Sequence, residues 1–320
     1  MALPDFFLIG APKAGTTALH AALAGHPDLF LSPVKEPKFF LCDGRPPARQ
    51  AGPGDAHSAR EWIWDRNRYE ALFAAAPPGA LRGESTPFYL HDPRAAERIQ
   101  RLVPEARLIA LLRDPVDRAH SNWMHLWSDG LEPVPDFVTA CRAEDERVRA
   151  GYAPFWEYRG LGRYGEQLER LYSVVDRRRV HVLRYRDLVD DPTATLDGIC
   201  AFLGVVPGAV APPAPENVRP SARDTRRTRA LAHVVRAGAR AGAHAPPQAW
   251  RWASRPLTRA LQAGGTPRPR LTADQRAEVL APLVDDIRLL ERVTGRSFDD
   301  WVTGGGRGDF SARRTATAPA

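Results

Sequence analysis

Short, uninterrupted apolar runs recur along the first two thirds of the chain, and each is bounded by glycine, proline or charged residues. Phe6–Ile9 stops at Gly10, and Leu81–Glu84, Arg107–Leu112 and Val180–Leu183 are the later examples. Runs of this length without polar alternation are typical of strands buried on both faces. The pattern predicts four strands of an interior sheet.

Segments with helical signals follow these runs. Helices are expected at Thr16–Ala24, Pro93–Leu102, Pro115 to about Asp129, and Thr193–Leu203. Proline at the first helical position and glycine after the last one support these boundaries. Strands that alternate with helices predict an α/β fold with a P-loop-type, mostly parallel sheet flanked by helices.

The pattern changes after Gly204. Residues 206–220 are rich in proline and alanine, and residues 219–270 hold twelve arginines against one acid, Asp224. Helices are expected at Thr225–Arg240 and Thr272–Thr294, whereas 304–320 has the composition of a disordered tail. We therefore expect one domain at 1–303, with 219–270 as a basic helical insert or lid.

Composition excludes several classes of protein. None of the 320 residues belongs to an 18-residue apolar stretch, the N-terminus lacks a basic leader, and Cys42, Cys141 and Cys200 form no CxxC pair. A cytoplasmic location is expected, without disulfides or a zinc site. The net charge of +7 leaves attraction to an anionic ligand or to a membrane surface open.

The basic residues are almost all arginine. The three lysines, Lys13, Lys35 and Lys38, lie within 26 residues of one another. Lysine is a compact point charge with an adjustable pKa, whereas arginine is a planar fork. Their clustering indicates positions where a guanidinium would not serve.

The segment Gly10–Thr17 joins the first strand to its helix and has the G-x-x-x-x-G spacing of a phosphate-binding loop. Thr16 occupies the position where a nucleoside triphosphatase needs lysine, and Lys13 lies inside the loop instead. Arg113 follows the strongest strand, where such enzymes have a metal-binding aspartate. These residues predict a site for a nucleotide with an additional phosphate and no required metal.

Several segments together resemble the PAPS-dependent sulfotransferases, particularly the branch with heparan sulfate and carbohydrate sulfotransferase domains (PAPS is 3′-phosphoadenosine-5′-phosphosulfate). In chain order, the segments that carry the resemblance are Pro12–Thr17, Lys35–Phe40, Gly83–Tyr89, Arg113–Ser121 and Asp187–Gly204. The resemblance implies sulfuryl transfer from PAPS to an acceptor hydroxyl or amine, with release of PAP.

The resemblance also assigns roles to residues. Glu36 is the expected general base, with Lys13 and Lys38 beside the transferred group. The loop residues Lys13, Ala14, Gly15, Thr16 and Thr17 would bind the 5′ side of the nucleotide. Arg113 and Ser121 would hold its 3′-phosphate, with Arg219 and Arg223 as further cations. His91, His120 and His125 are rival bases.

The sequence departs from the heparan sulfate enzymes at two positions, and these departures leave the identity of the acceptor open. Lys38 stands where the heparan enzymes have histidine, and Ser85 stands where they have lysine. Sugars, phenols, lipid-linked glycans and secondary metabolites all stay candidates, and one or two of the nearby aromatic residues are expected to line the acceptor pocket: Phe39, Phe40, Trp62, Trp64, Phe88 and Tyr89. Two other functions remain: a phosphotransferase with an altered P-loop, or a non-enzymatic protein that binds nucleic acid or membranes, for which no nucleic-acid motif is present.

Overall fold

The computed structural model describes residues 2–54, 58–211, 224–241, 247–262 and 269–304. A five-stranded parallel sheet with the order β2-β3-β1-β4-β5 forms its centre. The strands are β1 Phe6–Gly10, β2 Leu29–Leu31, β3 Leu81–Ser85, β4 Arg107–Leu112 and β5 Val180–Arg184. The four predicted strands are confirmed; β2 was not predicted because three residues give too little pattern to recognise.

Strand β1 lies in the middle of the sheet and explains why its sequence is apolar throughout. Successive side chains of a strand point to opposite faces, and Phe6, Phe7, Leu8 and Ile9 are all at most 1% exposed. Both faces of the sheet are therefore covered at β1. Gly83 on β3 is required here, since a Cβ atom would lie 2.2 Å from the ring of Phe6.

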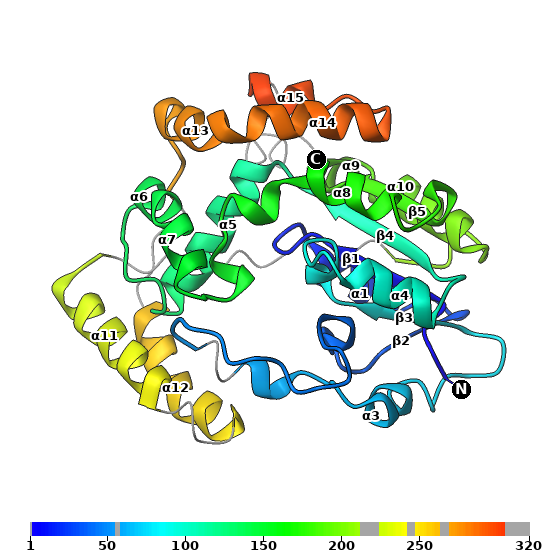
Figure 1. Cartoon of the computed structure of the whole chain (residues 1–320), viewed down its shortest axis with the longest axis horizontal. Coiled ribbons are helices and arrows are strands. Elements are labelled where there is room, and N and C mark those ends of the chain that lie inside the picture. Colours follow the sequence, from blue (N-terminus) through cyan, green and yellow to red (C-terminus); the bar gives the residue numbers. More distant parts are fainter. Residues whose placement is uncertain (1, 55–57, 212–223, 242–246, 263–268, 305–320) are drawn as a thin grey trace, which may run out of the picture.

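Helices follow the strands as expected, and Figure 1 shows them packed around the sheet. Those of the first two thirds of the chain are α1 Thr16–Leu23, α3 Arg66–Ala71, α4 Ala95–Leu102, α5 Pro115–Ser128, α6 Phe137–Arg142, α7 Glu144–Arg149, α8 Tyr164–Tyr172, α9 Tyr185–Asp190 and α10 Pro192–Leu203. The predicted α/β class with a mostly parallel sheet is confirmed. All strands are parallel, so the segments that follow β1, β3, β4 and β5 emerge at one edge of the sheet.

The basic insert forms two helices, α11 Arg226–Ala241 and α12 Pro247–Gln262, which pack against each other at the lower left of Figure 1. The pair contacts the C-terminal end of α5: Arg236 donates a hydrogen bond to the carbonyl oxygen of Gly130 across 3.0 Å, and Leu131 packs against their apolar contact. The predicted helix at Thr225–Arg240 is confirmed. Residues 305–320 of the expected disordered tail lie outside the described residues.

The helix predicted over Thr272–Thr294 is wrong as a single element. It is divided into α13 Ala273–Leu280 and α14 Val284–Thr294 by a 3-10 turn at Ala281–Leu283. Pro282 lies in that turn and cannot donate the backbone hydrogen bond that a continuous helix needs. The break lets α14 pack along α8, where the Asp286 carboxylate accepts hydrogen bonds from the backbone N–H groups of Gly165 and Glu166, both at 2.9 Å.

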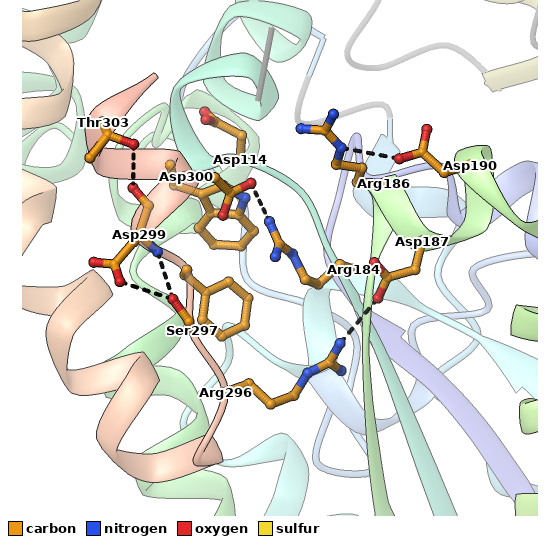
Figure 2. A network of polar contacts seen from close by, with 12 residues as sticks. Asp114, Arg184, Arg186, Asp187, Asp190, Arg296, Ser297, Asp299, Asp300 and Thr303 are labelled. Atoms are coloured by element: carbon orange, nitrogen blue, oxygen red, sulfur yellow. Dashed lines mark hydrogen bonds and ion pairs between the residues drawn. The ribbon is translucent and has the colours of Figure 1, made fainter. Parts of the chain in front are cut away.

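Charged residues attach the C-terminal segment, including α15 Asp299–Thr303, to the edge of the sheet that carries the functional loops. Figure 2 shows Arg184, at the end of β5, pointing to Asp300, and Arg296 pointing to Asp187 on α9. The Arg184 guanidinium also lies over the rings of Phe298 and Trp301, at 5.2 Å and 5.5 Å from their centroids. The C-terminal helices therefore brace the end of β5. No helix of the described residues is long and apolar enough to cross a membrane.

Candidate functional site

The loop between β1 and α1 has the backbone of an anion-binding turn. Lys13 and Gly15 have φ angles of 67° and 90°, and α1 begins at Thr16 without a side-chain cap. The first N–H groups of such a helix point outward and favour an anion. Lys13, Gly15, Thr16 and Thr17 line a cavity of about 700 Å³, whereas Ala14 is fully buried.

Arg113 connects this loop to the end of β4. Its Nη1 donates a hydrogen bond to the carbonyl oxygen of Lys13 at 3.2 Å, and its guanidinium lies 4.9 Å from the centroid of the Tyr185 ring. Arg113 is not among the described residues that line the cavity. The guanidinium is thus held at the strand tip from two sides, by the loop and by an aromatic face.

Tyr185 belongs to the site but was missed by sequence reasoning. Its ring approaches Gly15 so closely that a Cβ atom there would lie 2.8 Å from it. The sequence did contain a signal for it. Tyr185 directly follows β5, and residues that follow parallel strands lie together at one edge of the sheet.

Helix α5 carries the second expected anion contact. Asp114 caps the helix by accepting hydrogen bonds from the N–H groups of Val116 and Asp117, at 2.9 Å and 3.0 Å. Asp114 is in turn paired with Arg276 of α13. Ser121 lies two turns along α5 and lines the same cavity as the loop residues.

The segment Lys35–Lys38 contributes Glu36 and Lys38 to the lining of the same cavity. Glu36 and Lys38 both adopt left-handed conformations, with φ angles of 61° and 62°. Non-glycine residues reach this region at a cost and persist there only when the surroundings hold them. The Lys35 ammonium lies 2.6 Å from the Glu36 carboxylate.

Strand β3 and the residues after it hold that strained segment. The N–H of Glu36 donates to the carbonyl oxygen of Ser85 at 2.9 Å, and the N–H of Lys38 donates to the Thr86 hydroxyl at 3.3 Å. Thr86 donates in turn to the Glu84 carboxylate at 2.5 Å. The backbone around the expected base is therefore fixed by hydrogen bonds.

Glu84 is fully buried beneath this segment. Besides Thr86, it accepts hydrogen bonds from the hydroxyls of Tyr69 and Tyr89, at 2.5 Å and 3.2 Å. Burial raises the pKa of Glu84 to about 7, although the three hydrogen bonds act in the opposite direction. Glu84 is thus a titratable group within the scaffold that supports Glu36.

Ser85, one of the two departures, hydrogen-bonds with the Nδ1 of His20 at 2.8 Å. Burial, and the positive charge of Lys35, lower the pKa of His20 to about 4. A neutral serine–histidine pair thus occupies this place beside Lys35 and Glu36.

Lys38, the other departure, lies between two aromatic rings. Its Nζ is 5.1 Å from the centroid of Trp62 and 5.5 Å from that of Phe88. Trp62 and Phe88 both line the cavity; their expected role in binding the acceptor stays a prediction. Phe39, Phe40 and Tyr89 are buried core residues instead.

The three rival histidines separate in space. His91 and His125 line the cavity, each within 4 Å of a carboxylate: His91 is 3.4 Å from Glu157, and His125 is 3.6 Å from Asp129. His120 is absent from the described lining and stacks on Trp123 instead. Of the three histidines, His120 is therefore the weakest candidate for the general base.

Arg219 and Arg223 lie outside the described residues. The described part of the insert packs on Gly130 and Leu131, and no described residue of 224–262 lines the cavity. Closure of 219–270 over the nucleotide stays a prediction.

Residues 4–206 match the family model described as the sulfotransferase family. Among curated proteins, the human bifunctional heparan sulfate N-deacetylase/N-sulfotransferase 3 is 29% identical over 215 residues, covering 64% of this chain and 23% of that protein. Human heparan sulfate glucosamine 3-O-sulfotransferase 3B1 is 28% identical over 204 residues, covering 63% and 46%. The match thus spans less than half the length of either relative.

Among solved structures, a sulfotransferase from Alicyclobacillus acidocaldarius has a TM-score of 0.72 and 30% sequence identity. The alignment covers 94% of this chain and 100% of that chain.

Proposed function

The chain belongs to the sulfotransferase family, and we propose that it transfers the sulfuryl group of PAPS to an acceptor hydroxyl and releases PAP. The observation that carries the proposal is the contact between Arg113 and the carbonyl oxygen of Lys13. It joins a cation at the tip of β4 to a phosphate-type loop after β1. Two anion-binding groups held at a fixed separation suit a nucleotide with phosphates at both its 3′ and 5′ positions.

The described residues fit such a nucleotide. Lys13, Gly15, Thr16 and Thr17 offer an ammonium, backbone N–H groups and hydroxyls to the 5′ side. Ser121 lies in the same cavity and, with Arg113, would hold the 3′-phosphate. Tyr185 contacts both Gly15 and Arg113, and it therefore fixes the position of the loop relative to the Arg113 guanidinium.

PAPS would supply the sulfuryl group, which it carries on its 5′-phosphate. Residues of the chain would remove the acceptor proton and stabilise the charge that develops during transfer. Glu36 takes the acceptor proton while the acceptor oxygen bonds to sulfur and the bond from sulfur to the phosphate oxygen breaks. Lys13 stabilises the negative charge that develops on the departing phosphate, and Lys38 contacts the sulfuryl oxygens. Transfer of this kind depends on positioning and electrostatic stabilisation.

The alternative functions are not favoured by these observations. A phosphotransferase would need a metal-binding carboxylate where Arg113 stands. A cytoplasmic location, independence from metal ions and a peripheral membrane contact stay predictions.

A PAP-release assay tests the proposal. With PAPS and a panel of hydroxyl and amine acceptors, we expect PAP to form in amounts equal to the sulfated acceptor, with or without EDTA. PAP should also raise the melting temperature more than ATP with Mg²⁺ does. Equal or greater stabilisation by ATP with Mg²⁺, and no sulfated product from any acceptor, would overturn it.

A further inference from the structure

The cavity extends well beyond the residues assigned to the nucleotide. On α5, Ser121 lies at the nucleotide end, and His125 follows one turn later on the same side of the helix; the next residue, Leu126, also lines the cavity. Leu131 lines the cavity beyond the end of α5. The whole cavity, its nucleotide end included, has a volume of about 700 Å³, which is within the range of small-molecule sites.

An aromatic wall runs along this extension from the transfer point. Trp62 and Phe88 flank the Lys38 ammonium. Phe88 then meets Phe155 edge-on at 6.0 Å, and Phe155 meets the ring of His125 at 5.6 Å. A ligand that reached Glu36 along this wall would contact ring faces and edges through most of its length.

The end of the cavity near Leu126 and Leu131, the far end, is mainly apolar and supported from outside. These leucines line the cavity together with Pro47, Pro53 and Pro154, and Gln50, from the same loop as Pro47 and Pro53, is a polar member of the lining. Leu131 also packs against the buried cluster of Ala232, Val235 and Leu261 in the α11–α12 pair. The loop that carries Pro47 and Pro53 is fixed by a hydrogen bond of 2.8 Å from the N–H of Ala51 to the carbonyl oxygen of Gly151.

Few charges face this space. Apart from Lys13 and Lys38 at the transfer end, Arg94 is the one lysine or arginine among the described lining residues, and it lies 3.9 Å from Asp92, which also lines the cavity. A polyanionic glycan needs a row of cations to meet its carboxylates and sulfates. The described walls offer no such row.

We propose that the acceptor is a neutral hydroxyl compound with an apolar, ring-containing body, of the phenol or polycyclic alcohol type. This inference rests on the proposed sulfuryl transfer. The body lies between the aromatic wall and the leucines of the far end, which presents the hydroxyl group to Glu36. Trp62 and Phe88 select for ring compounds because aromatic contacts and apolar burial both favour them.

Calorimetric binding to the PAP-saturated protein tests the acceptor class. The probes are naphthol, a neutral hydroxysteroid and a heparosan hexasaccharide. We expect both ring alcohols to bind and the saccharide to show no heat. Tighter binding of the saccharide than of either ring alcohol would overturn the inference.

Variants locate the binding. Phe88→Leu should weaken naphthol binding about tenfold, through the loss of one aromatic contact and its buried area, and Trp62→Leu should weaken it similarly. The affinity for PAP, measured on the same samples, should not change. Phe202→Leu is the matched control, because Phe202 is equally half-buried but stacks on His181, away from the described cavity lining. Unchanged naphthol binding in both cavity variants would contradict the inference.

The same experiment separates this inference from the proposed function. If PAP itself fails to bind, the assignment of the nucleotide site is wrong. If PAP binds and the ring alcohols do not, the nucleotide site stands and the acceptor class is wrong.

Discussion

The guanidinium of Arg113 and the carbonyl oxygen of Lys13, 100 residues apart in sequence, are joined by a hydrogen bond of 3.2 Å. The contact links the tip of β4 to the loop after β1. In the proposed function, Lys13 would present its ammonium to the 5′ side of the nucleotide, and Arg113 would present its guanidinium to the 3′-phosphate. Each residue therefore helps to fix the position of the other.

Arg113→Ala should change which nucleotides bind. In the native protein, we expect PAP to raise the melting temperature clearly more than AMP does, since a hydrogen bond to a charged group contributes about 1.5–3 kcal/mol. The variant should lose most of that difference and keep its response to AMP. Arg186→Ala, which changes another arginine near the end of β5 that is paired with Asp190, is the control and should behave as the native protein does. Equal effects of PAP and AMP on the native protein would contradict the assignment.

Glu36→Gln should reduce turnover about 10²–10⁴-fold, because removal of the general base leaves the acceptor proton without a receiver. PAP affinity and the circular dichroism spectrum should be unaffected. Glu61→Gln changes an exposed glutamate and serves as the control. Near-native turnover of Glu36→Gln would transfer the role to His91 or His125, and each histidine would then be replaced in turn.

Gly15→Ala should impair nucleotide binding more than folding. A methyl group at Gly15 would lie 2.8 Å from the Tyr185 ring, at a φ of 90° that alanine avoids. Gly79 has a similar φ of 84° with nothing within 4 Å of the added atom, so Gly79→Ala isolates the backbone strain alone. We expect Gly79→Ala to lose only the stability that backbone strain costs, Gly15→Ala to lose that and an added amount from the contact with Tyr185, and PAP affinity to fall only in Gly15→Ala. Equal PAP affinities would show that the close approach of Tyr185 is unimportant.

Glu84→Gln should remove a pH dependence of stability. The pKa of Glu84 is raised from 4.5 to about 7 by burial, so the folded state binds the proton more tightly than the unfolded state. This contribution lowers the free energy of unfolding as pH rises from about 4.5 to about 7, by on the order of 3 kcal/mol. Glutamine does not titrate, and the variant should therefore gain stability relative to the native protein over that range.

Urea unfolding at pH 5, 6, 7 and 8 measures this difference. The lowered pKa of His20, about 4, produces the opposite slope at acid pH, but it does so in both proteins and cancels in the comparison. Parallel curves for the native protein and Glu84→Gln would mean that Glu84 does not titrate in this range.

The sequence alone determined the main strands, the loop after the first strand and the position of Arg113. Runs such as Arg107–Leu112 predicted their strands because a strand buried on both faces needs an apolar side chain at every position. The loop Gly10–Thr17 was predicted as a phosphate site because its spacing reflects local backbone geometry. Arg113 was predicted at a strand tip for the same reason. Such features depend on neighbouring residues, which a sequence displays directly.

The tertiary structure decided what depends on distant residues. Tyr185 contacts Gly15 and Arg113 only because parallel strands end at one edge. Glu84 is a buried, hydrogen-bonded group only because Tyr69, Thr86 and Tyr89 converge on it. The shape of the cavity likewise follows from loops and helices far apart in the chain. These contacts, the burial of Glu84 and the shape of the cavity depend on residues that are remote in sequence, so a local sequence pattern cannot predict them.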